Sequence, residues 1–392
     1  MARSPEVALM IDTSTVYGRR LLQGIARYLR LHRSWSFFLE QREVDGMPPT
    51  WLRTWRGDGL ISRWSIPAVT SMLEEFPGAV VDVSDRGPPH GLPRINSDDE
   101  MIGRLGARQL LDLRLGSFAY CGFADELWSR RRRDAFVAEL AGAGYPCQVY
   151  ESIWREAGVH LREDEQVRIG QWLNSLSRPV GVMASNDVRS IEIVNACRHR
   201  GLRVPEDVAV VGVDDDEILC QICNPTLSSI VPNIEMIGYE AAALLDTLMQ
   251  GGKADFQERF IPPLGVSSRL STDVFSVDDQ EFAAAVRLIR ENACHGIVVP
   301  DLLDRVPMSR STLERRFRDY LGRSPRAEIR GVQINQAKRL LAETDHPIRR
   351  IAELVGFDHT EYFHVVFKRE AGLTPGQYRR ASQANPSPVA LQ

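Results

Sequence analysis

Short apolar runs alternate with amphipathic stretches over the larger, N-terminal part of the chain. Each run has four to seven residues, and a segment whose apolar positions recur at helical spacing follows it. The runs are Val7 to Ile11, Ser36 to Glu40, Gly59 to Ser62, Ala79 to Val83, Ser117 to Gly122, Val180 to Ser185 and Val208 to Asp214. Strands that alternate with helices form parallel sheets covered on both faces. A pause near Asn96 to Gly116 predicts two such α/β lobes with a cleft between them.

Polar and aromatic side chains follow several of these runs, at the end of the sheet where ligands of parallel α/β proteins bind. These residues are Asp12, Tyr17, Arg19, Arg63, Trp64, Asp187 and Asp214 to Asp216. Aromatic rings beside carboxylates and a guanidinium suit a small polyhydroxylated ligand, because rings stack on CH groups while hydroxyl groups need fixed donors and acceptors. No GxGxxG or GxxxxGK(S/T) motif follows any run, so no nucleotide cofactor is expected.

One pattern occurs twice near the C-terminus, with the two copies fifty residues apart. The first copy consists of Leu313, Phe317, Gly322 and Ser324-Pro325, and the second of Phe363, Phe367, Gly372 and Thr374-Pro375. Each copy follows a short apolar helix, Pro300 to Val306 in the first case and Ile348 to Val355 in the second. A tight break separates that helix from the copy. This order is typical of a helix-turn-helix unit, whose second helix enters a DNA major groove.

The second helix of each unit turns its apolar residues inward and leaves polar residues for DNA. In the first unit, which Ser309 caps, we expect Ser311, Glu314 and Arg315 to contact base edges. Arg315 suits guanine O6 and N7, and Glu314 accepts from cytosine N4. Arg310 and Arg318 are expected to contact phosphates. The outward residues of the second unit are Thr360, Glu361, His364 and Val365, with Lys368 and Arg369 directed to the DNA backbone; His364 suits a phosphate as well as a base.

The segments that flank these units predict a spacer, a preceding helix and a tail. Arg326 to Ala342 predicts one helix of seventeen residues, about 26 Å long at 1.5 Å per residue. Such a spacer would hold two recognition helices close to one DNA turn apart, about 34 Å. Ser276 to Asp279 predicts the cap of a helix that runs to about Ala293. Residues 381–392 are small, polar and proline-bearing, which predicts disorder.

Composition and charge are those of a folded protein with at least two domains. The 392 residues are 43% hydrophobic and 26% charged, with a net charge of −4. From Ser276 onward, 18 Lys and Arg stand against 15 Asp and Glu, so this part carries +3 and the rest carries −7. The basic end coincides with the helix-turn-helix pair, where phosphates must be neutralised.

Targeting and metal-binding signals are weak. No apolar run has the length of a membrane span or a signal peptide, which predicts a cytoplasmic, nucleoid-associated protein without a membrane partner. The six cysteines lack the spacing of a disulfide framework. Cys220 and Cys223 lack the second ligand pair of a zinc site, so we expect no metal.

The N-terminal part resembles the lactose/galactose-repressor family. The stretch NDVRSIEIVNACRHRGLRVPEDVAVVGVDDDEI (Asn186 to Ile218) is similar to the effector-binding core of that family, and Pro263 to Thr272 is similar to its closing strand. The resemblance covers roughly Val7 to Thr272. It implies that Asp187 and Asp214 bind sugar hydroxyls and that Arg132 is the ligand-binding arginine. Repressors of that family begin with a helix-turn-helix, whereas this chain begins on its first strand.

The C-terminal part resembles the AraC family of transcription regulators. Ile351 to Arg379, IAELVGFDHTEYFHVVFKREAGLTPGQYR, is similar to the signature of that family. An AraC-type reader behind a repressor-like body resembles the family of xylose-operon regulators over nearly the whole chain. That resemblance implies a homodimer that binds D-xylose, recognises double-stranded operator DNA and works with RNA polymerase. The implied pocket positions are Tyr17, Trp64, Trp128, Arg132, Asp187 and Asp214.

Ordinary structural roles remain open for several of these residues. Arg130 to Arg133 also fits a solvated basic face, and Trp128 fits surface packing. Asp187 also fits a helix cap, and Asp214 to Asp216 fits a turn or a cation site. The effector is D-xylose or a related aldose, because the stereochemistry of one hydroxyl can depend on a single side chain.

The sequence therefore predicts a type I periplasmic-binding-protein-like α/β body followed by an all-α domain with two helix-turn-helix units. The expected boundaries are 1–272 for the sugar-binding and dimerisation domain, 273–280 for a linker, 281–380 for the DNA-binding domain and 381–392 for the tail. The expected function is a sugar-responsive transcription activator without enzymatic activity. The alternatives are a DNA-tethered sugar-modifying enzyme, a regulator that responds to another aldose, and a solute receptor for a transporter.

Overall fold

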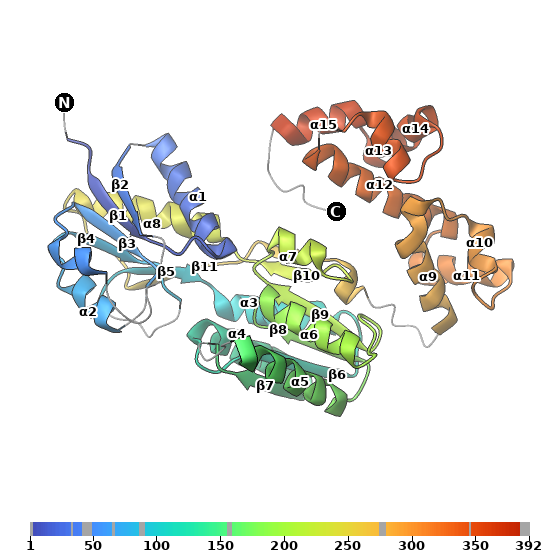
Figure 1. The fold of residues 1–392 in the computed structure, drawn as a ribbon, viewed down its shortest axis with the longest axis horizontal. Helices are drawn as coiled ribbons and strands as arrows, with labels where there is room; N and C mark the ends of the chain where they lie inside the picture. The colour runs from blue at the N-terminus through green and yellow to red at the C-terminus, as the bar shows by residue number, and fades with distance from the viewer. Residues whose placement is uncertain are drawn as a thin grey trace. The chain divides into compact units, whose positions relative to one another are not determined.

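Two mainly parallel sheets, each covered by helices, and a separate group of helices make up the structure of the described residues (Figure 1). The computed structural model describes residues 3–32, 34–40, 49–64, 67–85, 91–154, 159–273, 280–344 and 346–384. The chain divides into unit 1, Met1–Ser276, and unit 2, Val277–Gln392. This division falls inside the segment 273–280 that was expected to be a linker.

The first lobe of unit 1 is built on a six-stranded parallel sheet with the order β11-β5-β4-β3-β1-β2. Its strands are β1 (Glu6–Met10), β2 (Ser36–Glu40), β3 (Gly59–Ser62), β4 (Ala79–Asp82), β5 (Arg94–Ser97) and β11 (Glu258–Ile261). Helices α1 (Val16–Leu31) and α8 (Ile234–Met249) lie side by side on one face (Figure 1). Helix α2 (Pro67–Glu74) and the turn η1 (Thr50–Thr54) contribute to the core on the other face.

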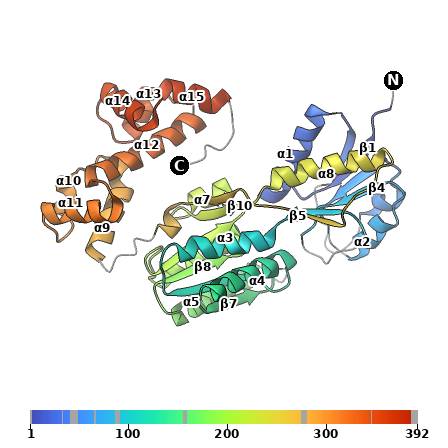
Figure 2. The same cartoon turned by 180° about the vertical axis from the view of Figure 1, so that it is seen from behind.

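The second lobe has a six-stranded sheet with the order β12-β10-β9-β8-β6-β7. Its strands are β6 (Ser117–Phe123), β7 (Cys147–Ser152), β8 (Val180–Ala184), β9 (Val208–Val213), β10 (Ser228–Val231) and β12 (Gly265–Ser267), of which β12 alone runs antiparallel to its neighbour. Helices α3 (Asp99–Leu111) and α4 (Leu127–Gly142) lie side by side on one face (Figure 2). The other face carries α5 (Val159–Ser175), α6 (Asp187–His199) and α7 (Glu217–Ile222). The turn η2 (Leu270–Thr272) ends the described part of this unit.

Alternation along each strand explains why both faces of the sheets are buried. In β1, Val7 and Leu9 pack against α1 and α8, whereas Ala8 and Met10 pack toward α2. Successive side chains of a strand point to opposite faces, so a strand covered on both sides must be apolar throughout. Each fully buried Val, Leu, Ile or Met side chain contributes about 1.5–3 kcal/mol.

The predicted pause near residues 96–116 is wrong. Strand β5 ends at Ser97, and α3 begins at Asp99 after its cap Asp98, whose side chain accepts from the Met101 amide at 2.8 Å. The hydrophobic pattern did not predict β5, because three of its four residues are polar. These three are buried with hydrogen bonds or ion pairs. The chain crosses here from the first lobe to the second. It crosses again between β10 and α8 and between β11 and β12.

Unit 2 is helical throughout its described residues. It contains α9 (Gln280–Asn292), η3 (Ala293–His295), α10 (Val299–Leu303), α11 (Arg310–Leu321), α12 (Pro325–Glu343), α13 (Ile348–Leu354), α14 (Thr360–Ala371) and α15 (Pro375–Ala384). Ser309 caps α11 as predicted, because its side chain accepts from the Thr312 amide. The predicted spacer is α12, whose 19 residues give a length of about 28 Å. The proposed cap at Ser276 to Asp279 lies outside the described residues.

The tail begins later than the sequence indicated. Helix α15 continues to Ala384, so residues 381–384 are helical, and residues 385–392 lie outside the described part of the chain. Tyr378 anchors this helix, because it packs against the core of the second helix-turn-helix unit. The next four residues, Ala-Ser-Gln-Ala, contain neither glycine nor proline, so nothing in them ends the helix.

No helix among the described residues combines the length and the apolar composition needed to cross a bilayer.

Candidate ligand-binding cleft and DNA-recognition helices

The first lobe brings an aromatic ring, a guanidinium and a carboxylate together at the carboxyl ends of its strands. Tyr17, in the first turn of α1, places its hydroxyl oxygen 3.2 Å from Ser97 Oγ at the end of β5. The Arg63 guanidinium carbon lies 4.3 Å from the centroid of the Tyr17 ring. Nη2 of Arg63 lies 3.4 Å from both carboxylate oxygens of Asp85. We call Tyr17, Arg63, Asp85, Arg132 and Asp214 the cleft cluster.

The second lobe contributes Arg132, which is 2% exposed and held on two sides. Its Nε donates to Asp99 Oδ1 at 2.8 Å, and its Nη1 donates to the Ser185 carbonyl at 2.7 Å. The guanidinium carbon lies 4.9 Å from the Trp128 ring centroid, and Trp128 Nε1 donates to a carboxylate oxygen of Glu126 at 3.0 Å. Arg132 is therefore fixed in one orientation before any ligand arrives.

Asp214 follows β9, and charged side chains from both lobes act on its carboxyl group. Burial raises the pKa of its carboxyl to about 6, against the lowering effect of the positive charges of Arg132, Arg63 and Arg20. Among the described residues, the Asp214 carboxylate accepts no hydrogen bond. Its backbone φ is +110° and that of Asp215 is +49°, conformations that cost about 1–3 kcal/mol each in residues other than glycine. Such a cost in two successive residues beside buried charged groups indicates a functional constraint.

Asp187 is buried, and both of its carboxylate oxygens already have donors. Oδ1 accepts from Ser229 Oγ at 2.7 Å, and Oδ2 accepts from the Asp216 amide at 2.8 Å and from Cys220 Sγ at 3.4 Å. Burial and then the neighbouring Asp214 charge raise the pKa of Asp187 well above its ordinary value. Asn186 caps α6, because its side chain accepts from the Arg189 amide, so Asp187 is not the cap. Asp187 instead supports the turn after β9 by accepting from the Asp216 amide.

Trp64 is placed apart from the cleft cluster. It is 2% exposed and belongs to the hydrophobic cluster that includes Met10, Val69 and Leu73, on the face of the sheet away from α1. Arg63 and Trp64 are consecutive, and consecutive side chains of an extended segment point in opposite directions. Arg63 therefore reaches Tyr17 while Trp64 packs into the core. The sequence had favoured Trp64 for the ligand.

Three members of this site were absent from the expected ligand set, namely Arg63, Asp85 and Asp99. Arg63 and Asp85 follow β3 and β4 and obey the same strand-end rule that selected Asp214. No sequence pattern indicated Asp99, because its role is to accept a hydrogen bond from Arg132, which lies in another helix. Burial raises the pKa of Asp99 to about 6, and the Arg132 charge opposes that rise.

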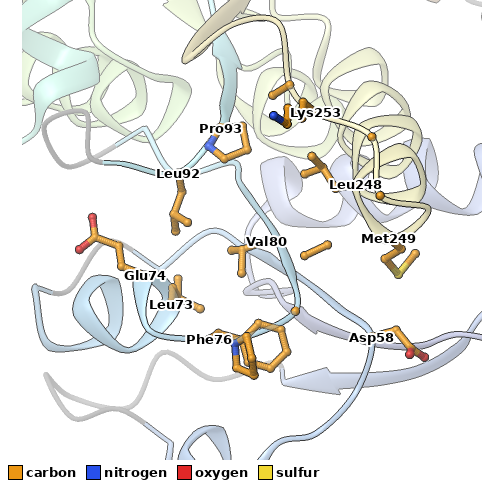
Figure 3. A pocket seen from close by; sticks show the side chains of 16 residues that line it. Asp58, Leu73, Glu74, Phe76, Val80, Leu92, Pro93, Leu248, Met249 and Lys253 are labelled. Atoms are coloured by element: carbon orange, nitrogen blue, oxygen red, sulfur yellow. The ribbon is translucent and has the colours of Figure 1, made fainter.

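A separate pocket lies at the opposite end of the first sheet (Figure 3). It has a volume of about 580 Å³, and its lining includes Asp58, Phe76, Val80, Met249 and Lys253. Asp58 precedes β3, whereas Arg63 follows it, so this pocket is at the amino ends of the strands. Ligands of parallel sheets bind at the carboxyl ends, which favours the cleft cluster as the candidate site. His, Cys, Asp and Glu side chains in the described ranges form no group of three or more suited to a metal ion.

The first recognition helix, α11, is oriented as its apolar spacing predicted. Leu313 and Phe317 are fully buried, and Ser311 and Arg315 are exposed. Arg310 and Arg318 are exposed as well, and Arg310 Nε lies 3.2 Å from Oε1 of the half-buried Glu314. An exposed pair of this kind costs little to separate, so both side chains remain free to turn toward DNA.

The second recognition helix, α14, buries Phe363, Val366 and Phe367. The outward residues include Glu361, Lys368 and Arg369, which are exposed, and Thr360 and His364, which are half-buried. Val365 is 64% exposed, an unusual position for a large apolar side chain on a polar face. An exposed valine in a recognition helix suits the methyl group of thymine.

Helix α12 connects the second helix-turn-helix unit to η3, the segment that precedes the first helix-turn-helix unit. Gln333, which is 2% exposed, donates through Nε2 to the carbonyl oxygens of Ala293 at 2.9 Å and Gly356 at 3.2 Å. Gly356 lies in the turn between α13 and α14 with a φ of +79°. A Cβ there would lie 3.0 Å from the carbonyl oxygens of Ala293 and Cys294. The turn therefore packs directly on η3.

A two-lobed α/β body with charged side chains from both lobes brought together, followed by paired helix-turn-helix units, defines a ligand-responsive DNA-binding regulator. Three family models match the chain: a XylR N-terminal domain over residues 6–87, a periplasmic binding protein-like domain over 107–272 and a helix-turn-helix domain over 302–381. A xylose operon regulatory protein from Haemophilus influenzae is 32% identical over 383 residues, which cover 95% of this chain and 98% of the relative. The chain belongs to the family of xylose operon regulatory proteins.

Two further comparisons agree with this assignment. The xylose operon regulatory protein of Escherichia coli K12 is 29% identical over 386 residues, 95% of this chain and 96% of the relative. The solved structure of the xylose-binding transcription activator XylR matches with a TM-score of 0.76 and 28% identity, covering 97% of this chain and 99% of that one. The predicted fold class and the predicted AraC-type regulator are confirmed. The enzyme alternative is excluded, because this family consists of transcription regulators.

Proposed function

We propose that this protein is a D-xylose-induced activator that binds operator DNA upstream of xylose-catabolism genes as a homodimer in the cytoplasm, on the nucleoid. The observation that carries the proposal is the cleft cluster, in which ionic groups from two lobes converge on one space. Residues 1–272 are assigned to effector binding and dimerisation, and residues 281–380 to operator binding. RNA polymerase is the partner that an activator at a promoter requires.

The cleft cluster offers complementary groups to a small sugar. Arg132 and Arg63 donate to ring and hydroxyl oxygens, whereas Asp214 and Asp85 accept from hydroxyl groups. The rings of Tyr17 and Trp128 supply faces for the CH groups of a pyranose. Asp187 acts on the ligand through the turn that it supports, and Trp64 stabilises the lobe behind the site. No cofactor is needed.

Effector binding controls DNA binding through the arrangement of the lobes. A sugar held by both lobes binds the closed arrangement more tightly than the open one, and only this difference in affinity shifts the equilibrium. In a dimer, closure of each protomer changes the relation between the two DNA-binding units. The recognition helices α11 and α14 then fit successive major grooves.

The effector is identified with a panel of sugars on the full-length protein. D-xylose is expected to raise the melting temperature more than D-ribose, L-arabinose, D-lyxose and D-glucose, because a ligand stabilises the native state in proportion to its occupancy. In fluorescence anisotropy, D-xylose is expected to strengthen binding to a promoter fragment of a xylose gene over random duplex. An equal shift with another aldose would replace D-xylose with that sugar. The absence of any shift together with sugar-independent DNA binding would reject effector control.

A further inference from the structure

The turn that carries Asp214 is held by an arginine from the other lobe. Arg20, in the second turn of α1, donates through Nη1 to the Asp214 carbonyl and through Nη2 to the Asp215 carbonyl, both at 2.8 Å. Helix α1 packs on the first sheet, whereas Asp214 and Asp215 follow β9 of the second sheet. The two hydrogen bonds therefore join the lobes of unit 1 directly.

The bonded carbonyls belong to the two residues with strained backbones. Asp214 and Asp215 have φ values of +110° and +49°, and Arg114 is the other residue with a positive φ besides glycines in the described part of the chain. Two successive carbonyl groups point at one guanidinium, whose planar fork matches such a pair of acceptors. From within the second lobe, Arg269 holds the same turn through an ion pair of 2.7 Å with the Asp215 carboxylate.

Arg20 shares one face of α1 with Tyr17, because residues three apart in a helix are neighbours. Tyr17 belongs to the cleft cluster, and the charge of Arg20 acts on the Asp214 carboxyl. Arg20 is thus adjacent to the site on the first lobe and bonded to its acidic residue on the second. Its Nη1 and Nη2 both donate to backbone oxygens, which assigns Arg20 to the turn.

We propose that Arg20 is a positioning residue that couples closure of the two lobes to the conformation of the Asp214–Asp215 turn, and thereby places the Asp214 carboxylate for the effector. When the lobes separate, the turn loses two charged donors and relaxes, so the acceptor for the sugar exists only in the closed arrangement. The sugar contact rests on the function proposed above, whereas the link between Arg20 and the turn does not.

The link is tested without any sugar by hydrogen exchange on the full-length protein. Arg20→Met keeps the length of the side chain but removes the donors. It is expected to speed exchange of the peptide that contains Asp214 and Asp215 by about tenfold or more, as local opening becomes easier. Arg19→Met is the matched control, because Arg19 also donates to two carbonyls, those of Thr13 and Ser14, but within its own lobe. Exchange in Arg20→Met equal to that of the wild type would overturn the proposal.

The consequence for the ligand is tested by calorimetric titration with D-xylose. Arg20→Met is expected to weaken binding by about tenfold or more, the change that follows loss of hydrogen bonds to a charged group. Arg20→Lys, which can reach one carbonyl, should restore part of the affinity, and Arg30→Met, at an exposed position in the last turn of α1, should bind like the wild type. Faster exchange with unchanged affinity would refute the positioning role. If wild-type protein bound no aldose, the proposed function would fail, while the exchange result would still decide whether Arg20 holds the turn.

Discussion

At the scale of single residues, Asp214 combines a costly backbone conformation with a carboxylate that accepts no hydrogen bond from the described residues. Its neighbours Arg132 and Arg63 come from different lobes, and burial keeps its pKa near the physiological range, at about 6. A carboxylate of this kind is a strong acceptor for a hydroxyl group and is stabilised by the cations around it. It is therefore the residue on which effector affinity should depend most directly.

Asp214→Asn is expected to weaken D-xylose binding by about 1.5–3 kcal/mol, roughly ten- to a hundredfold, because an amide oxygen is a weaker acceptor than a carboxylate. Isothermal titration of the wild type and the variant measures the change. The control is Asp112→Asn, at an exposed residue after α3 that should leave affinity unchanged. Equal affinities for Asp214→Asn and the wild type would remove Asp214 from the site.

Effector binding is also expected to weaken as the pH falls through about 6, because the raised pKa means that Asp214 takes up a proton there. The same proton uptake stabilises the ligand-free fold in this interval, since the unfolded chain does not bind that proton until a pH of about 3.9. The shift in melting temperature caused by D-xylose should therefore shrink between about pH 7.5 and pH 5.5, while the ligand-free melting temperature does not fall on this account. A constant shift would contradict the role of the charged carboxyl.

Residue-level chemistry was predictable only in part. Tyr17, Arg132 and Asp214 could be selected because they follow strands or match a family motif, and the structure groups them. Asp99 and Arg20 could not, since each acts on a partner far away in the sequence. For Trp64, the strand-end rule identified the end of a strand but not the face to which the side chain points, which in the structure is that of the cluster with Met10 and Val69.

At the scale of elements, hydrophobic spacing was a reliable guide to the helices and to the strands that are apolar. It gave α11, the spacer α12 and strands such as β2 and β3 with nearly correct ends. It missed β7, β10 and β11. It also missed β5, whose buried residues are held by hydrogen bonds and ion pairs. Polar burial leaves no periodic signal, because its stability depends on partners that only the folded chain provides.

Helix α11 presents side chains with different tasks on DNA. Arg315→Ala is expected to cost about 1–3 kcal/mol at one base position and to relax preference there, because a bidentate contact with guanine would be lost. Arg318→Ala is expected to weaken binding to all duplexes alike and to lower the salt dependence, as loss of a phosphate contact does. Anisotropy titrations with an operator and its single-base variants distinguish the two. Uniform weakening by Arg315→Ala would assign it to the phosphate backbone instead.

The turn between α13 and α14 tolerates no side chain. Gly356→Ala is expected to destabilise unit 2 by about 1–3 kcal/mol, because the new Cβ meets a positive φ and two carbonyl oxygens. Gly331→Ala is the matched control: its Cβ would meet nothing within 4 Å, and alanine in a helix interior stabilises by about 0.5–1 kcal/mol. Thermal unfolding measures both. Stability of Gly356→Ala equal to that of the wild type would contradict the close packing of the turn on η3.

At the scale of the whole molecule, sensing and DNA recognition are assigned to separate cores. Each unit buries its own hydrophobic clusters, and the division falls between Ser276 and Val277. The arrangement lets one part respond to a small molecule while the other keeps its recognition helices in a fixed relation. In the proposed homodimer, a change within each protomer would become a change in DNA affinity.

Residues 277–392 produced alone are expected to fold and to bind operator DNA with no response to D-xylose, since they retain both recognition helices. Affinity should be lower than that of the full-length protein, because a dimer gains from two linked binding events. Mobility-shift titrations with and without sugar measure both effects. A sugar response in the isolated unit would place effector binding outside unit 1.

The three crossings of the chain between the lobes limit how such regulators can exchange parts. Because β11 completes the first sheet long after the chain has entered the second lobe, neither lobe corresponds to a continuous stretch of the gene. A single recombination point between the first and second lobes would combine strands from different parents in the first sheet. A new inducer can therefore be acquired by point substitution or by exchange of the entire sensor, whereas the operator preference can be exchanged with one cut.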